Sequence, residues 1–202
     1  AEHQPDVASH WDLPANAEAQ QFASNMPKMF ARIGDVLIGQ AILAQAIIDV
    51  LELENVALLG GGTPTPLSPS HQHIAYYTDK NPEAIAEAEQ AGYTTLQVDV
   101  LDAAAIAQLK DASTAVGTGL MHFMDDAQFV QVLNNLHAAG IDTFAFNHVD
   151  VTEVGEQPVM KKFVAQMYGR TQDEIAALLP EGWQIKDTWR MLEILSKAPE
   201  IG

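Results

Sequence analysis

Three consecutive glycines that directly follow a short apolar run constrain the fold of this chain most strongly. The run Val56–Leu59 leads into Gly60, Gly61 and Gly62, and Pro64 follows soon after. An apolar run this short, bounded by Gly and Pro, is typical of a buried strand in a parallel sheet. Glycines at its carboxyl end let the backbone turn sharply and lie against a ligand, because no Cβ stands in the way.

A second run of strand-forming residues, Ile74–Thr78, ends in a single acid, Asp79. A carboxylate at a strand tip can accept two hydrogen bonds from a ribose diol. The carboxyl ends of neighbouring parallel strands meet at one edge of the sheet, so the glycines and Asp79 predict a nucleoside-binding corner. A plain tight turn without a ligand is the competing interpretation of the glycines.

The three glycines and Asp79 resemble motifs I and II of the class I S-adenosylmethionine (SAM)-dependent methyltransferases. The run Asp79-Lys80-Asn81-Pro82 is close to the helix start that follows the second motif in that family. Two positions depart from the family pattern. Leu58 stands where the family has an acid that anchors the methionine end of SAM, and Pro64 stands where it has its third glycine. Pro64 makes the turn rigid and stops a helix from starting at once.

The resemblance is closest to a small actinobacterial-type branch with Gly-x-Gly-x-Pro-Thr and His-Phe motifs, and it implies further contacts to SAM. Asp99 is expected to face the adenine amino group, and Val100 is expected to cover the ring. Gly119 and Met121 belong to the purine-lining step around the His-Phe pair. Arg32 would pair with the carboxylate of SAM in place of the missing acid. A helix cap for Asp99 and a surface ion pair for Arg32 are the alternatives.

The substrate side is predicted at the end of the strand Thr143–Asn147, where Asn147, His148 and Asp150 follow one another closely. Ligands of open parallel sheets sit outside the carboxyl ends of the strands, which makes these three residues the candidate catalytic group. The pKa of a histidine suits proton transfer near neutral pH. The alternative is that His148 and Asp150 only cap and pin a loop.

The order of elements predicts an α/β fold, a Rossmann-like three-layer sandwich with a seven-stranded, mostly parallel sheet and one antiparallel strand. Trp183–Lys186 and Thr188–Ile194 alternate in polarity and predict a closing hairpin. Residues 1–53 form a predicted N-terminal helical extension, whose first 15 residues are either a lid or a frayed terminus. Residues 54–202 form a SAM-binding Rossmann-like domain.

Composition excludes several classes of partner. The 202-residue chain carries a formal charge of −17, which disfavours nucleic acid and anionic membranes, and the same acidity serves solubility. It contains no cysteine, so disulfides and thiolate chemistry are excluded. His71 and His73 lack a third ligand nearby, so no metal site is expected. The N-terminus lacks the pattern of a signal peptide, which predicts a cytoplasmic protein.

These observations predict a SAM-dependent enzyme, in the first place a methyltransferase acting on a small molecule of secondary metabolism. One alternative is a SAM-consuming lyase that closes the aminocarboxypropyl arm, as in azetidine-2-carboxylate formation, and releases methylthioadenosine. Another is a non-catalytic SAM or nucleoside binder, and a homodimer stays open in each case. A Rossmann oxidoreductase is a more distant reading, because it needs a full Gly-x-Gly-x-x-Gly opening directly into a helix.

Overall fold

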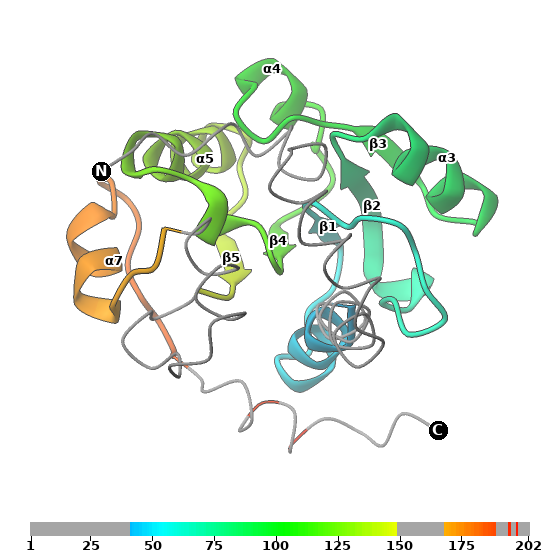
Figure 1. Ribbon diagram of the computed structural model, residues 1–202, viewed down its shortest axis with the longest axis horizontal. Coiled ribbons are helices and arrows are strands. Elements are labelled where there is room, and N and C mark those ends of the chain that lie inside the picture. Colours follow the sequence, from blue (N-terminus) through cyan, green and yellow to red (C-terminus); the bar gives the residue numbers. More distant parts are fainter. Residues whose placement is uncertain (1–40, 149–167, 189–193, 195–196, 198–202) are drawn as a thin grey trace, which may run out of the picture.

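A five-stranded, entirely parallel sheet lies at the centre of the computed structural model, which describes residues 41–148, 168–188, 194 and 197 (Figure 1). The spatial order of its strands is β3-β2-β1-β4-β5. Every neighbouring pair runs parallel. The strands are β1 (Val56–Leu58), β2 (Ile74–Asp79), β3 (Thr95–Gln97), β4 (Thr114–Gly117) and β5 (Thr143–Phe146).

The strand order reverses at β1, and this reversal determines where a ligand can bind. Leu58, the last residue of β1, is in register with Tyr77 of β2 on one side and with Val116 of β4 on the other. The chain after β1 turns towards β2, whereas the chain after β4 leads to β5 on the opposite side. In open parallel sheets the crevice outside such a switch point is the usual ligand site. The glycine bend that follows β1 lies at this point.

Helices cover both faces of the sheet, because successive side chains of a strand point to opposite sides. Val56 and Leu58 pack against the helical residues 41–50 and against α3 (Pro82–Gln90). Ala57 and Leu59 pack on the other side, in a core shared with α4 (Ala103–Ile106), α5 (Asp126–Ala138) and α7 (Gln172–Leu178). Figure 1 shows these helices on either side of the sheet. The predicted three-layer α/β sandwich is thereby confirmed for the described residues.

Polar side chains cap the N-termini of four α-helices in the described part of the chain. Each cap accepts hydrogen bonds from backbone N–H groups in the first turn, which have no partner inside a helix. Two of the four caps form a complete capping box, in which a side chain of the first turn bonds back to the cap residue. The caps are Asn81 for α3, Asp102 for α4, and Asp125 and Thr171, with their capping boxes, for α5 and α7.

The described chain differs from the predicted sheet at its C-terminal end. Residues 183–188 are described and belong to no strand, whereas most of Thr188–Ile194 lies outside the described residues. The antiparallel strand and the total of seven therefore stay predictions. Residues 1–40 of the predicted N-terminal extension also lie outside the described part, and residues 41–50 are helical.

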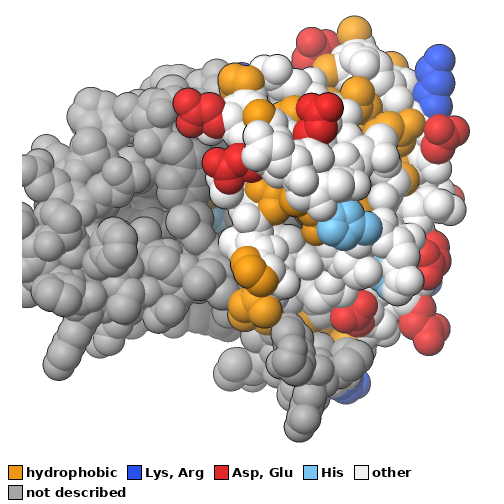
Figure 2. Space-filling view, turned by 90° about the vertical axis from the view of Figure 1, so that its right-hand side faces the viewer, with side chains coloured by type: hydrophobic (Ala, Val, Ile, Leu, Met, Phe, Trp, Pro, Cys, Tyr) orange, Lys and Arg blue, Asp and Glu red, His pale blue; other side chains and the backbone are white. Residues whose placement is uncertain are grey.

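The described surface carries the acidity of the composition. Figure 2 shows acidic side chains scattered over the described part of one face, with few basic ones among them. Of the helices that the structure describes, none is both long enough and apolar enough to cross a bilayer.

Candidate functional site

The glycine bend and Asp79 lie on neighbouring strand tips and contact each other directly. The Gly62 N–H donates to Asp79 Oδ2 at 2.8 Å, and the Gly61 N–H donates to the carbonyl of Thr78 at 2.9 Å. Gly60 and Gly62 have φ values of 60° and 64°, a region that residues with a Cβ rarely adopt. Glycine therefore occupies the positions where the chain turns from β1 towards the tip of β2.

Backbone contacts on both oxygens fix the orientation of the Asp79 carboxylate. Oδ2 accepts from Gly62, and Oδ1 accepts from the N–H of Asn81 at 2.8 Å. An ionised carboxylate offers about four acceptor positions, so about two are left for a ligand. A pair of vicinal hydroxyls is the kind of donor that fits such a group.

Tyr77 of β2 supports the glycine bend, a role that the sequence did not reveal. Its hydroxyl lies 2.8 Å from the Gly61 carbonyl and 2.7 Å from the Gly62 carbonyl, and its single hydrogen is shared between these two acceptors. Its ring fills the space beside Gly61, where an added Cβ would come within 2.6 Å of ring carbon Cε1. Burial, together with the nearby Tyr93 and Asp79, raises the pKa of Tyr77, so its hydroxyl stays protonated as a donor.

Asp99 and Val100 follow β3 at the same edge of the sheet. Asp99 Oδ1 accepts from the N–H of Leu101 at 3.0 Å, and Oδ2 forms an ion pair with Lys80 Nζ at 3.3 Å. Asp99 does not cap α4, because Asp102 does so. Val100 is buried, and its carbonyl accepts from the Asn135 side chain at 2.9 Å. The loops after β2 and β3 are thus tied together by the Lys80–Asp99 pair.

The tips of β4 and β5 are joined by a side chain predicted to be catalytic. Asn147 Oδ1 accepts from the Gly119 N–H at 2.8 Å, so this amide oxygen holds the loop after β4. Gly119 has a positive φ of 67°, consistent with the turn made there. Met121 begins the short 3-10 helix η3 (Met121–Phe123) and is buried in the core on the α5 side. Asn147 therefore has a positioning contact within the described residues.

His148 is oriented by a backbone carbonyl. Its Nδ1 lies 3.0 Å from the carbonyl oxygen of Arg170, and a carbonyl can only accept a hydrogen bond. Nδ1 therefore carries the hydrogen, which in the neutral ring leaves the lone pair on Nε2. An imidazole held in this tautomer has the form that a general base requires.

Comparison with known proteins was informative only at the level of structure. No protein-family model and no curated protein matches the sequence. The mitomycin 7-O-methyltransferase MmcR aligns with a TM-score of 0.52 and 17% identity, over 79% of this chain and 52% of MmcR. This chain has the fold of the class I SAM-dependent methyltransferases. It spans about half the length of MmcR.

Two further structures align over 79% of this chain with weaker superposition. LaPhzM has a TM-score of 0.46 at 16% identity over 54% of its own chain. The complex of LepI with SAM has a TM-score of 0.43 at 13% identity over 47% of its own chain. Ligand and activity are therefore argued from the residues of this chain.

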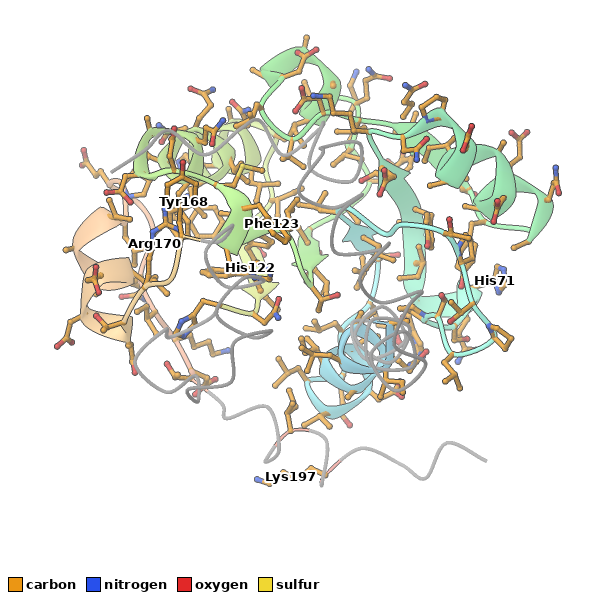
Figure 3. All side chains as sticks on the ribbon, viewed as in Figure 1. His71, His122, Phe123, Tyr168, Arg170 and Lys197 are labelled. Atoms are coloured by element: carbon orange, nitrogen blue, oxygen red, sulfur yellow. The ribbon has the colours of Figure 1, made fainter. Side chains whose placement is uncertain are left out.

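Arg170 connects the segment that follows β4 with the segment that follows β5. Its guanidinium is buried, donating to the Met124 carbonyl at 2.6 Å and to Asp126 Oδ1 at 3.0 Å. Its charge lies 4.8 Å above the centre of the Phe129 ring. Figure 3 shows Arg170 next to Tyr168 and near η3. The side chain of Arg170 thus holds the segment after β4, while its carbonyl orients His148 beyond β5.

Sequence reasoning missed both Tyr77 and Arg170, because neither belongs to a recognisable motif. The cue for Tyr77 was its position two residues before Asp79, in a strand paired with β1. Arg170 carried the weaker cue of a cation in a chain with few basic residues. Arg32 and Asp150, which the sequence placed in the site, lie outside the described residues.

A hollow of about 390 Å³ is lined by none of the predicted site residues. Prolines of the link between β1 and β2 line it, together with Gln45 and a stacked pair of rings, His71 and Tyr93, whose centroids are 3.9 Å apart. His71 Nε2 is already bonded to the Ala91 carbonyl, and His73 pairs with Glu54. This hollow has no feature of the predicted nucleoside site.

Proposed function

We propose that this protein binds SAM and transfers its methyl group to a small molecule. The observation that carries the proposal is the direct hydrogen bond between the glycine bend and Asp79 on neighbouring strand tips. In a methyltransferase fold, a carboxylate oriented in this way is suited to the ribose of an adenosine. A small-molecule acceptor, a role in secondary metabolism, a cytoplasmic location and a homodimer belong to the same proposal.

The proposed chemistry asks little of the protein beyond positioning. The sulfonium of SAM makes its methyl carbon electrophilic, and the protein has to align an acceptor behind that carbon and exclude water. The methyl carbon forms a bond to the acceptor atom and loses its bond to sulfur, which leaves with the electron pair as a neutral thioether. The acidic surroundings favour the cationic sulfonium over this product.

His148 is the proposed general base for an acceptor hydroxyl or protonated amine. Its Nε2 lone pair is free in the tautomer that the Arg170 carbonyl imposes. We expect His148→Gln to lower methyl transfer by about 10²–10⁴-fold and to leave the Kd of SAM unchanged. Single-turnover assays together with SAM titrations check this. Loss of SAM binding in the variant would assign His148 a structural role instead.

The proposal is tested by titrating SAM calorimetrically against wild type and Asp79→Asn. A hydrogen bond to a charged group contributes about 1.5–3 kcal/mol, so the variant should bind SAM about 10–150-fold more weakly. Asp111→Asn is the matched control, because Asp111 is an exposed acid whose carboxylate, among the described residues, accepts from the Tyr76 hydroxyl and lies outside the glycine bend. Equal affinity in wild type and Asp79→Asn contradicts the assignment of the ribose site.

A SAM lyase that releases methylthioadenosine is the second candidate. It is favoured by the region around the methionine end, where Leu58 replaces an acid and the chain after the bend forms no α-helix. Incubating the protein with SAM alone separates the two enzymes. Methylthioadenosine above the uncatalysed background supports the lyase, and its absence excludes it. A non-catalytic binder is expected to bind SAM and to show no turnover with a broad panel of acceptors.

A further inference from the structure

The link between β1 and β2 lacks the element that usually binds the charged part of a nucleotide. Parallel strands are normally joined through an α-helix, whose N-terminus attracts anionic groups. Here residues 59–73 are all described, and they contain only the 3-10 helix η2 (His71–His73). Pro64, Pro66 and Pro69 interrupt this stretch, and proline has no N–H to contribute to a helix. No helix dipole therefore points at the site from this link.

Several backbone N–H groups of the link are also bonded within the protein. Those of Gly61 and Gly62 donate to the Thr78 carbonyl and to the Asp79 carboxylate, as described above. The N–H of Thr65 donates to Ser68 Oγ at 2.9 Å, and that of Leu67 donates to Thr65 Oγ1 at 3.2 Å. An anion-binding loop turns such groups towards its ligand. This bend instead uses the N–H groups of Gly61 and Gly62 to hold its own shape and the orientation of Asp79.

The end of β1 provides no charged partner for an ammonium group either. Leu58 is 3% exposed and packs in the core beneath helical residues 41–50. An apolar side chain at this position can neither accept a hydrogen bond nor balance a positive charge. Asp79 thus provides a carboxylate for a ribose, whereas the stretch 56–70 carries no acidic or basic side chain for an amino acid end.

We propose that this site recognises its adenosine ligand mainly through the nucleoside and gains little affinity from an attached amino acid. The inference rests on the proposed function, since it names the part of the SAM-type ligand that the site recognises. S-adenosylhomocysteine and methylthioadenosine compare the two parts directly. Both carry adenosine and a neutral sulfur, and only the former has the aminocarboxyl end.

The experiment measures the Kd of both thioethers for the full chain by calorimetry, with adenosine 5′-monophosphate as the anionic comparison. We expect the two thioethers to bind within about tenfold of each other, since an anchored carboxylate contributes about tenfold or more. Adenosine 5′-monophosphate should bind more weakly than methylthioadenosine, because the link between β1 and β2 offers its phosphate no helix N-terminus. Asp79→Asn should weaken both thioethers by the same factor.

S-adenosylhomocysteine binding more than about tenfold tighter than methylthioadenosine overturns the inference and leaves SAM binding intact. In that case Arg32→Ala identifies the anchor, because loss of the difference in that variant assigns the carboxylate to Arg32. Tighter binding of adenosine 5′-monophosphate than of methylthioadenosine overturns the inference by making the bend an anion site. If neither thioether nor SAM binds, the proposed function fails together with the inference.

Discussion

Replacing Tyr77 by phenylalanine tests how the glycine bend is held. The change removes the hydroxyl that donates to the Gly61 and Gly62 carbonyls, and it keeps the ring that packs against Gly61. A buried hydrogen bond contributes about 1 kcal/mol net, and leaving its acceptors without a donor adds to the loss. We expect the free energy of unfolding to fall by about 1–2 kcal/mol, which corresponds to about 2–8 °C in melting temperature for a chain of this size.

The neighbouring residue of β2 is a matched control. The Tyr76 hydroxyl donates to the exposed carboxylate of Asp111 at 3.2 Å, so Tyr76→Phe should change the free energy of unfolding by less than about 0.5 kcal/mol. Urea unfolding and thermal melts of both variants measure the difference. Equal stability of Tyr77→Phe and Tyr76→Phe would refute the argument that Tyr77 supports the bend.

The same variant has a second, functional readout. Because the bend carries the Gly62 N–H that orients Asp79, loosening it should weaken SAM binding by about fivefold, equivalent to about 1 kcal/mol. Tyr76→Phe should bind SAM like wild type. An unstable Tyr77→Phe protein with unchanged SAM affinity would separate the stability of the bend from its use in binding.

Three further outcomes are expected. Arg170→Lys should lower the free energy of unfolding by about 2–3 kcal/mol in urea, because lysine cannot make the several hydrogen bonds of the buried guanidinium. Asp126→Asn changes the exposed partner of Arg170 and should lower it by less than about 1 kcal/mol. Gly61→Ala should cost about 2–3 kcal/mol through its clash with the Tyr77 ring, and Gly62→Ala about 1 kcal/mol through its positive φ alone, as thermal melts would show. The pKa of Tyr77 is raised in the folded protein above its ordinary value of 10.0. As the pH rises past that value, the unfolded chain therefore loses the Tyr77 proton before the folded protein does. The stability it provides is therefore complete below that pH and is lost as the pH rises further, and Tyr77→Phe should flatten this alkaline loss of the urea midpoint. An unchanged alkaline profile in the variant would contradict the assignment to Tyr77.

Local patterns predicted most of the elements, because each has a physical cause that acts within a few residues. Asn81 and Asp102 begin helices because their side chains accept orphan N–H groups of the first turn, whatever the helix packs against. The run Val56–Leu59 predicts a buried strand, because a strand of a parallel sheet is covered on both faces and is therefore apolar at every position. The proline-rich stretch after the glycines correctly predicted that no helix starts at once.

The terminal hairpin shows where such patterns lose their value. Trp183–Lys186 alternates in polarity like a strand, yet these residues lie outside the sheet, and the Trp183 indole donates to the Leu133 carbonyl of α5 at 3.1 Å. A strand needs a partner strand of matching register, and alternation alone does not supply one. The partner in the predicted hairpin, Thr188–Ile194, lies mostly outside the described residues.

The sequence by itself determined the order of strands and helices, their caps, and the placing of the glycines and Asp79 at the ends of consecutive strands. Only the tertiary structure decided what these groups contact. It brought the Tyr77 hydroxyl to two glycine carbonyls, and it joined Arg170 to η3 with its side chain and to His148 with its carbonyl. The physical reason is distance along the chain. Caps and turns act between residues a few positions apart, whereas Gly62 and Asp79 or His148 and Arg170 meet only because the parallel sheet gathers its strand tips at one edge.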